Sequence, residues 1–212
     1  MDTQGADTAR RGRIDGDEAR RRILDAAERL FYARGVQAVG MDQIRDAAGV
    51  SLKRLYQCYP SKDVLVEAYL EHRDRRWNQA LAEHVGRVAT PRERVAAVFG
   101  FLAEWFETAD FRGCSFINAF GELGPTSPPV AAAARAHKRR LRERLGTLVT
   151  EAGAADPDAL ADQLLLLVEG AIVAAAMGTA TGPAERARSA AGALLDAATA
   201  PDHALVPPQS RP

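Results

Sequence analysis

Two short helical segments with almost no chain between them are the feature that most limits how this sequence can fold. Residues 41–48 and 51–59 both show apolar residues at helical spacing, and only Gly49 and Val50 separate them. The residues expected to face inward are Met41, Ile44, Ala47 and Ala48 in the first segment and Leu52, Leu55, Tyr56 and Tyr59 in the second. Helices of about eight residues are marginal in water by themselves, so a third element must brace them. Residues 17–34 supply an amphipathic helix for this purpose. Its apolar face consists of Ile23, Ala27, Leu30 and Phe31.

The rest of the chain is also predicted to be helical. No stretch alternates apolar and polar residues with a period of two, and Ala, Leu, Arg and Glu dominate the composition. The sequence therefore predicts an all-α fold of about nine helices. Glycines and prolines set the helix ends. After the three N-terminal helices, the expected helices cover residues 62–85, 91–108, 113–123, 128–153, 157–179 and 184–200.

The pair of short helices has the build of a helix-turn-helix. In that motif, the second helix offers its N-terminal residues to base edges in the major groove of DNA. The second helix here contains SLKRLYQCY, and its outward positions are Lys53, Arg54 and Gln57. Each of these side chains can donate hydrogen bonds to phosphate, guanine or adenine. A structural helical hairpin with a solvated Lys–Arg face explains the same pattern equally well.

The charge distribution is uneven although the chain has 28 basic and 28 acidic residues. Residues 10–62 hold 12 Lys and Arg against 7 Asp and Glu, whereas residues 63–212 hold 16 basic and 19 acidic residues. A basic segment on a mildly acidic body suggests that one end of the molecule contacts a polyanion. Charge scattered over helix surfaces is the alternative explanation.

Cysteine usage and hydropathy indicate a cytoplasmic protein. The two cysteines, Cys58 and Cys114, are too few for a disulfide framework. The first 22 residues contain no apolar core of a secretory signal. The longest apolar stretch, residues 164–180, contains Glu169 and is shorter than the roughly 20 residues that span a bilayer. We therefore expect no membrane partner.

Several short motifs resemble the DNA-binding region of the tetracycline-repressor (TetR) family. These motifs are AAGVS at 47–51, Leu55-Tyr56, and Tyr59-Pro60-Ser61-Lys62, and the resembling stretch covers about residues 20–70. GCSFINAFGEL at 113–123, followed by a long Arg-rich helix, looks like a subgroup common in high-GC bacteria. The resemblance implies a one-component transcriptional regulator that pairs as a homodimer on a pseudo-palindromic operator. It also implies release from DNA by a small-molecule effector, with repression as the expected sign.

The resemblance assigns DNA-contacting roles to individual residues. Ser51, Tyr56 and Lys62 match positions that contact the DNA backbone in the family. Lys53, Arg54 and Gln57 match the variable positions that read the operator. Two departures stand out. Gly40 replaces a Ser or Thr, so the helix at 41–48 lacks a side-chain cap. Arg45 replaces a small residue and is expected to extend its guanidinium outward, towards a phosphate.

The resemblance and the sequence together predict four segments. Residues 1–16 form a disordered basic arm, whose Arg10–Arg13 stretch either reaches the minor groove or remains solvated charge. Residues 17–62 form the helix-turn-helix domain, and residues 63–200 form the effector-binding and dimerisation domain. Residues 201–212 form a flexible tail. The dimer is expected to pair through apolar faces of the last two long helices, and burial of these faces within one subunit is the alternative. The faces contain Leu160, Leu164, Leu167, Ala171, Ala174 or Ala175, Ala191, Leu194 and Leu195.

An effector site is expected where aromatic residues gather between positions 99 and 120. Aromatic residues at helical spacing more often form a core than a pocket, but polar residues at helical spacing within and near this cluster strengthen the case for a pocket. A buried carboxylate at Glu169 would need a partner or a function. The alternative is a closed aromatic core. The predicted effector-binding residues are Phe101, Trp105, Cys114, Phe116, Asn118, Glu122 and Glu169.

Enzymatic chemistry is the rival class, and the sequence offers little for it. The four histidines lie far apart and form no HExxH pair, and Gly113–Ile117 lacks the second glycine of a nucleophile elbow. We therefore expect no catalytic residues, metal ligands or cofactor. The residues are also compatible with a regulator that has no ligand, either constitutive or responsive through the Cys114 thiol. A purely architectural DNA binder is a second rival, but the acidic body that follows the basic segment argues against it.

Overall fold

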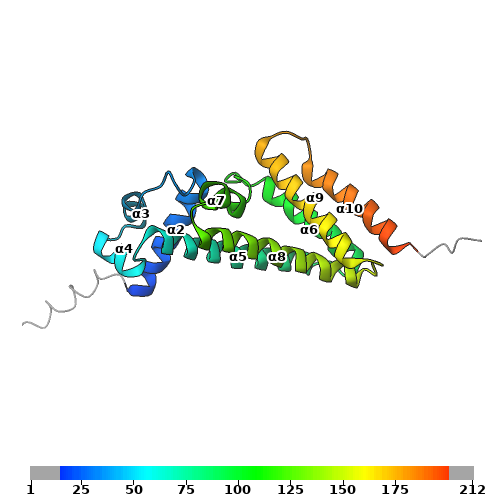
Figure 1. Ribbon diagram of the computed structural model, residues 1–212, viewed down its shortest axis with the longest axis horizontal. Coiled ribbons are helices and arrows are strands. Elements are labelled where there is room, and N and C mark those ends of the chain that lie inside the picture. Colours follow the sequence, from blue (N-terminus) through cyan, green and yellow to red (C-terminus); the bar gives the residue numbers. More distant parts are fainter. Residues whose placement is uncertain (1–14, 201–212) are drawn as a thin grey trace, which may run out of the picture. The chain divides into compact units, whose positions relative to one another are not determined.

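The computed structural model describes residues 15–200 of the chain, and within that range it contains nine helices and no strand (Figure 1). The all-α prediction is confirmed for these residues, and the predicted helix ends lie within two residues of the observed ones. The predicted Arg10–Arg13 contact and the tail at 201–212 lie outside the described residues. The helices are α2 (Gly16–Arg34), α3 (Met41–Ala48), α4 (Leu52–Cys58), α5 (Lys62–Val85), α6 (Pro91–Phe106), α7 (Ser115–Leu123), α8 (Pro128–Glu151), α9 (Pro157–Met177) and α10 (Pro183–Thr199).

The chain divides into two compact units. The first, called the N-terminal unit, contains the chain up to Gln79 together with Arg112–His137. The second, called the C-terminal unit, contains Ala80–Phe111 and the chain from Lys138 onward. Helices α5 and α8 each begin in the first unit and end in the second. The predicted boundary between a DNA-binding and an effector-binding domain at residues 62 and 63 divides the chain by function rather than by compactness, and it remains a prediction.

Helix α2 braces the two short helices α3 and α4, as their length requires (Figure 1). The side chains between them are fully or almost fully buried. This contact stabilises α3 and α4, which are too short to be stable alone. Gly49 ends α3 with a φ of 64°, a left-handed conformation that glycine adopts without strain. The core of this three-helix unit contains Ile23, Ala27, Phe31, Ile44 and Leu55.

The buried stripe of α4 is rotated relative to the prediction. Leu55 and Tyr59 are buried as expected, but Leu52 and Tyr56 are 42% and 45% exposed. Leu52 and Tyr56 lie one turn apart, so they share a stripe beside the buried one. Cys58 completes the buried stripe in their place. On α3 the prediction was also wrong for Ala47, which is exposed, whereas Ile44 and Ala48 form the buried contact.

A buried carboxylate joins α2 to α5. Glu28 is only 8% exposed, and three basic side chains of α5 surround it. His72 Nδ1 lies 3.0 Å from Oε2, while Arg73 and Arg76 donate to Oε1 at 3.0 and 3.1 Å. Desolvation would raise the pKa of Glu28, but the hydrogen bond from Arg73 and the nearby positive charges outweigh it. The pKa therefore lies below its ordinary value of 4.5.

The segment that begins α7 is tied to the same helix. The Tyr32 hydroxyl of α2 donates to the carbonyl oxygen of Gly113 and accepts from the backbone N–H of Arg112, both at 2.9 Å. The Arg73 guanidinium covers the Tyr32 ring at 4.4 Å from its centroid. Tyr32 is thus held from both sides. These contacts place α7 in the N-terminal unit beside the helix-turn-helix.

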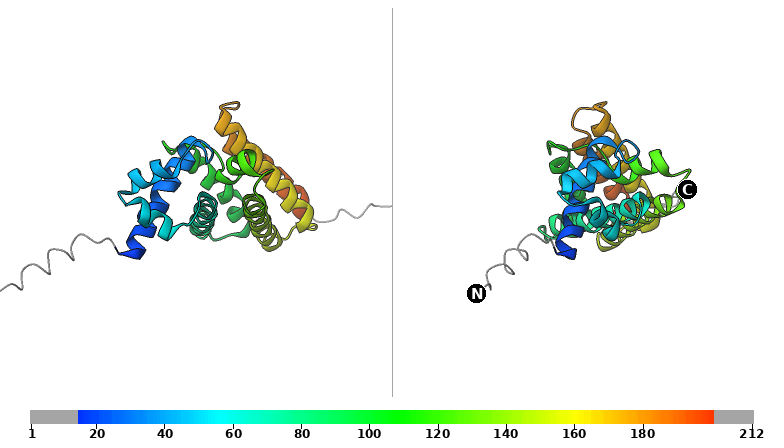
Figure 2. Two further views of the ribbon diagram at one scale, coloured as in Figure 1. Left: turned by 60° about the vertical axis from the view of Figure 1, so that its left-hand side comes forward. Right: turned by 90° about the vertical axis from the view of Figure 1, so that its left-hand side faces the viewer.

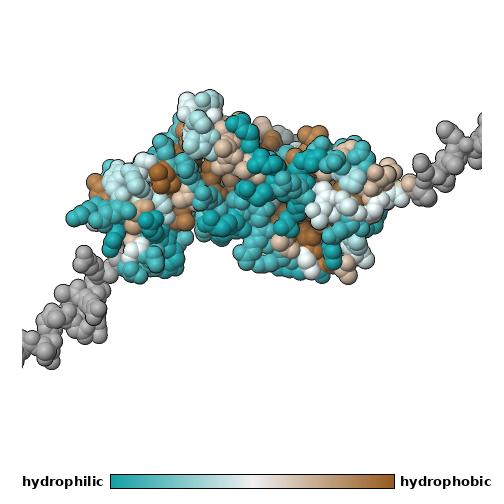
Figure 3. Space-filling view, turned by 60° about the horizontal axis from the view of Figure 1, so that its bottom comes forward, coloured by the Kyte–Doolittle hydropathy of each residue, from teal (hydrophilic) through white to brown (hydrophobic). Residues whose placement is uncertain are grey.

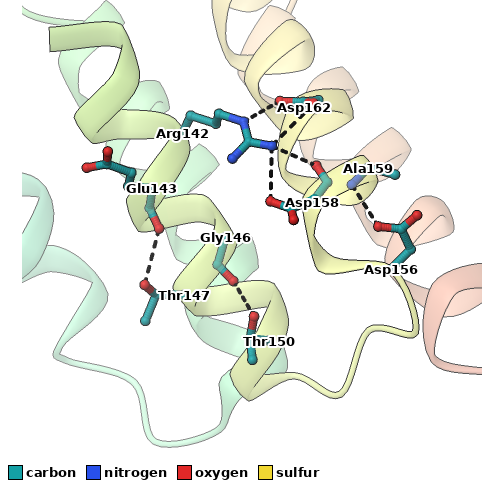
Figure 4. A network of polar contacts seen from close by, with 9 residues as sticks. All are labelled: Arg142, Glu143, Gly146, Thr147, Thr150, Asp156, Asp158, Ala159 and Asp162. Carbon is teal, nitrogen blue, oxygen red and sulfur yellow. Dashed lines mark hydrogen bonds and ion pairs between the residues drawn. The ribbon is translucent and has the colours of Figure 1, made fainter. Parts of the chain in front are cut away.

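In the C-terminal unit, α9 and α10 lie side by side and both contact α6 (Figure 2). The start of α9 is joined to α8 by Arg142 (Figure 4). The Arg142 guanidinium contacts Asp162 at 2.5 Å and Asp158 at 3.1 Å, while the Asp156 carboxylate caps α9 by accepting from the Ala159 N–H. The Arg142 contacts therefore fix the start of α9 against α8, while the Asp156 cap stabilises its first turn.

The apolar faces predicted to form a dimer interface are mostly covered within the same chain. Leu160, Leu164 and Ala171 of α9 and Ala191 and Leu195 of α10 are between 0% and 5% exposed. The assignment of these residues to a dimer interface was therefore wrong, because α6, α9 and α10 cover one another's apolar faces. The exposed apolar side chains of α9 are Leu166, Val173 and Met177.

Helix α9 is long and apolar enough to cross a membrane by length and composition alone. Core helices of water-soluble proteins are often as long and as apolar, so length and composition alone are weak evidence for a membrane-spanning helix. Here α9 packs on α6 and α10, and its Glu169 accepts from the Lys138 ammonium of α8 at 2.8 Å. The face of the molecule drawn in Figure 3 is predominantly hydrophilic, with apolar residues in small separate patches.

Removing the charge of Glu28 should destabilise the fold. Glu28→Gln leaves His72, Arg73 and Arg76 without a carboxylate, and breaking a buried ion pair costs about 3–5 kcal/mol. Because Arg76 is 63% exposed and water can compensate it, we expect a loss of about 2–3 kcal/mol in the free energy of unfolding, measured with urea. Glu18→Gln is the control, since Glu18 pairs only with exposed Arg21 and Arg22 on its own helix, and should leave stability unchanged.

The effect should depend on pH in one direction. The pKa of Glu28 is lower in the folded state than its ordinary value of 4.5, so its stabilisation is complete above about pH 4.5 and lost as pH falls through the folded pKa. The stability difference between the wild type and Glu28→Gln should therefore shrink below pH 4.5. A difference that stays constant down to the acid-unfolding limit would contradict the assigned ion pair.

Candidate nucleic-acid interface

One side of α4 is exposed and rich in hydrogen-bond donors. Lys53 and Gln57 are exposed, and Arg54 is partly exposed. Tyr56, which is 45% exposed, joins this face. Because Leu55 and Cys58 anchor the opposite side in the core, the donor face points away from the three-helix unit. An exposed helix of this kind fits the major groove, and its donors suit guanine, adenine and phosphate.

The first residue of this face has a structural role as well. The Ser51 hydroxyl oxygen accepts from the backbone N–H of Arg54 at 3.2 Å and so caps α4. Its proton can still be donated to a phosphate oxygen. Ser51 therefore fits both the predicted backbone contact and the start of the reading helix.

Lys62 lies at the start of α5. Its ammonium donates to the carbonyl oxygen of Gln37, in the turn between α2 and α3, at 3.4 Å. The N-terminus of a long helix attracts anions because its first N–H groups have no partner within the helix. The Lys62 ammonium adds a positive charge at the same place. This arrangement fits the predicted contact with the DNA backbone.

Arg45 is held by acidic neighbours on its own helix. Its guanidinium lies 2.8 Å from the Asp42 carboxylate and 2.7 Å from that of Asp46. The two carboxylates offset its charge, so any phosphate must compete with them. The missing cap at Gly40 is partly replaced, because the Gln43 amide oxygen accepts from the Gly40 N–H at 3.3 Å.

The predicted effector-binding residues are divided between the two units. In the N-terminal unit, Phe116 is 3% exposed and stacks on His137 with 3.9 Å between ring centroids. Cys114 is 5% exposed, so its thiol is shielded from solvent oxidants. Asn118 donates to the Arg112 carbonyl at 3.0 Å. Glu122 forms hydrogen bonds with Gln37 of the helix-turn-helix.

In the C-terminal unit, the other predicted residues fall into separate contacts. Trp105 packs edge-on against Phe111 at 5.1 Å and contacts Phe106 at 6.0 Å, so these three rings form an aromatic cluster. Phe101 meets the His84 ring at 5.9 Å. Glu169 pairs with Lys138. The structure thus places the predicted aromatic residues Phe101, Trp105 and Phe116 in three separate contacts. The predicted carboxylates Glu122 and Glu169 are engaged in polar contacts.

Sequence reasoning missed two polar groups of the N-terminal unit. One is the Glu28 cluster, and the other is the pair His137–Asp74, in which the imidazole Nδ1 lies 2.7 Å from the carboxylate and the histidine is 3% exposed. The signal for Glu28 is its place beside Ala27 on the buried face of α2. His137 gave no signal within the Arg-rich helix. Among the described residues, no group of three or more His, Cys, Asp or Glu could hold a metal ion.

Two family models match this chain. Residues 23–69 match the model described as bacterial regulatory proteins, tetR family. Residues 91–191 match the model described as tetracyclin repressor-like, C-terminal domain. The first match covers α3, α4 and most of α2, and so includes the whole donor face. Together the two matches extend over more than half of the chain.

Individual relatives agree with these models. An uncharacterized HTH-type transcriptional regulator of Mycobacterium tuberculosis is 32% identical over 145 residues, which cover 57% of this chain and 70% of the relative. A TetR-family transcriptional regulator from Streptomyces coelicolor has a similar structure, with a TM-score of 0.80, 30% identity, and coverage of 87% of this chain and 97% of that one. A putative regulator from Streptomyces avermitilis is 34% identical, with a TM-score of 0.74 and coverage of 85% and 97%.

Substitutions on the donor face should separate base reading from backbone contact. Lys53→Ala or Arg54→Ala should weaken binding to the preferred DNA sequence by about 1–3 kcal/mol and relax its selectivity. Lys62→Ala should weaken binding to all DNA sequences alike, and should reduce the slope of log affinity against log salt concentration by about one unit. Fluorescence anisotropy at several salt concentrations measures both. A Lys53/Arg54 double alanine variant with undiminished affinity and selectivity would show that α4 is not the reading helix.

Proposed function

The chain belongs to the TetR family of bacterial transcriptional regulators, and from this premise we propose that it represses transcription by binding a pseudo-palindromic operator as a homodimer. A small-molecule effector would release it. The family consists of helix-turn-helix regulators that bind DNA and small molecules, and it is not an enzyme family. A cytoplasmic location follows from the proposed function.

The exposed donor face of α4 is the observation that carries the proposal. Lys53, Arg54 and Gln57 all project from one short helix whose other side is anchored in the core. A base-reading helix needs this combination, because sequence is read by several donors held in fixed relative positions. Flanking groups at Ser51 and Lys62 fit phosphate contacts that set the position of the helix on the duplex.

An exposed apolar stripe on α9 supports the homodimer. Leu166, Val173 and Met177 are 73%, 41% and 70% exposed, and their spacing of seven and four residues puts them on one side of the helix. Gly170 lies between them on the same side and leaves open space around its Cα. Such a stripe on a water-exposed helix suits a self-complementary interface in a two-fold dimer.

The aromatic cluster of Trp105, Phe106 and Phe111 is our proposed position for part of the effector site. All three side chains are partly exposed, and their tilted and edge-on contacts leave apolar ring surface for a ligand. Binding there would favour conformations in which the two reading helices do not fit successive major grooves. Reciprocal linkage then requires operator DNA to weaken effector binding by the same factor.

Selection from random double-stranded DNA tests the proposed function. The full-length protein should enrich one sequence with two-fold symmetry, whose half-sites lie about 10–10.5 base pairs apart or at a multiple of that distance. Enrichment of no sequence, or binding that depends on salt but not on sequence, would be incompatible with a specific regulator.

The dimer interface can be tested by placing a charge on the α9 stripe. Leu166→Asp should raise the dimer dissociation constant about tenfold or more, because a carboxylate is costly in an apolar interface. Operator affinity should fall with it. Sedimentation velocity measures the first effect, and Ala103→Asp on an exposed position of α6 is the control. A Leu166→Asp dimer as stable as the wild type would place the interface elsewhere.

The effector site can be tested once a thermal-shift screen has yielded a ligand that releases the operator. Trp105→Ala should abolish release while leaving operator affinity intact, and Glu107→Ala at the end of the same helix should respond normally. Phe116→Ala is a poor probe, because Phe116 is buried against His137 and its removal would open a cavity. A Trp105→Ala protein that responds like the wild type would exclude the aromatic cluster.

A further inference from the structure

The end of α7 is fastened to the turn between α2 and α3 by one pair of residues. The Glu122 carboxylate accepts from the backbone N–H of Gln37 at 2.7 Å. In return, the Gln37 side-chain amide donates to the backbone carbonyl of Glu122 at 2.5 Å. We call this reciprocal pair the α7 latch. Both residues belong to the N-terminal unit, so the latch lies within one compact body.

The turn is shaped to admit the Glu122 carboxylate. Gly35 has a φ of +87°, a left-handed conformation that disfavours side chains. A Cβ at Gly35 would also lie only 2.9 Å from Glu122 Oε1 and 3.1 Å from Oε2. Glycine is therefore required both by the backbone and by the close approach of the carboxylate.

The latch contributes little to the stability of the fold. Gln37 is exposed and Glu122 is partly exposed, so water can satisfy either partner if the other is removed. Hydrogen bonds that exchange readily with water give a small net stabilisation. The latch instead fixes geometry, because it joins two segments that lie 85 residues apart in the sequence.

The same turn is connected to the proposed DNA-contacting residues. The Gln37 carbonyl accepts from the Lys62 ammonium at 3.4 Å, and α3 begins four residues after Gln37. Tyr32 fastens the segment before α7 to α2. The three N-terminal helices are therefore attached at two points, through Tyr32 to the segment before α7 and through the latch to the end of α7. The latch is the point connected to Lys62, because Gln37 contacts both Glu122 and Lys62.

We propose that Glu122 is a positioning residue for operator binding. Acting through Gln37, it holds the helix-turn-helix against α7 within the N-terminal unit, and so removes one source of variation in the separation of the two reading helices of a dimer. This inference rests on the proposed function. An operator fixes the distance between its half-sites. A dimer whose two helix-turn-helix domains, here called heads, are already restricted in separation therefore loses less conformational entropy when it binds.

The proposal predicts an effect on spacing that a merely structural role would not produce. Without the latch, each head still reads its half-site, but the dimer tolerates a wider range of separations. Affinity for the correctly spaced operator should fall, and affinity for operators with one or two inserted base pairs should fall less. Affinity for an isolated half-site should stay constant.

The experiment uses the full-length dimer and the operator selected with the wild-type protein. Glu122→Ala should weaken operator binding about fivefold to tenfold and reduce the preference for the correct spacing by a similar factor. The melting temperature and half-site affinity should not change. Glu122→Gln is the conservative variant and should restore both quantities, because its amide oxygen can accept from the Gln37 N–H. Glu143→Ala, an exposed carboxylate on α8, is the matched control.

A double-mutant cycle shows whether the two residues act together. Each single variant leaves one of the two hydrogen bonds in place, because each side chain bonds to the backbone of the other residue. Gln37→Ala with Glu122→Ala should therefore bind the operator more weakly than either single variant. Wild-type affinity and spacing preference in Glu122→Ala would overturn the proposal. So would an equal loss on operator and half-site accompanied by a lower melting temperature, since that pattern indicates a structural role. If the wild type selects no sequence at all, both the proposed function and the role of Glu122 are overturned. If the wild type selects an operator and Glu122→Ala binds it normally, only the role of Glu122 is overturned.

Discussion

The buried carboxylate of Glu28 is the interaction on which the arrangement of the N-terminal unit depends. A carboxylate that is 8% exposed is tolerated only with charged or hydrogen-bonding partners, and here Arg73, Arg76 and His72 come from one side of α5. Helices α2 and α5 can therefore pack in only one register without leaving Glu28 unpaired. Since α2 also braces α3 and α4, this register places the whole helix-turn-helix at the start of α5.

The functional consequence is that polar residues position the DNA-binding helices while apolar residues only hold them together. Leu55 anchors α4, but the carboxylates of Glu28 and Glu122 determine where the three-helix unit lies on α5 and α7. Directional, charged contacts have fewer equivalent arrangements than apolar packing. They suit a protein in which the position of a reading helix carries the function.

Much of the fold could be predicted from the sequence because its helix ends carry local signals. Gly49, Pro91 and Ser51 end or begin helices for reasons contained within a few residues. What covers each helix face is not a local property. The periodicity around Leu160 predicts a dimer interface wrongly, because it shows that a face is apolar without showing which neighbour buries it. The prediction that Glu122 binds an effector has a similar weakness, since its partner Gln37 lies 85 residues away in the sequence.

Directed cleavage of operator DNA from α4 tests the central claim most directly. Cys58 and Cys114 are buried, so a Gln57→Cys protein can be labelled at that position with an iron chelate that cuts nearby DNA. If α4 is the reading helix, cuts should form two clusters inside the protected operator, related by its two-fold axis. A label at Ser189→Cys, exposed on α10, should cut little. Equal cutting from both positions, or cuts outside the protected sequence, would contradict the assignment of α4 to the major groove.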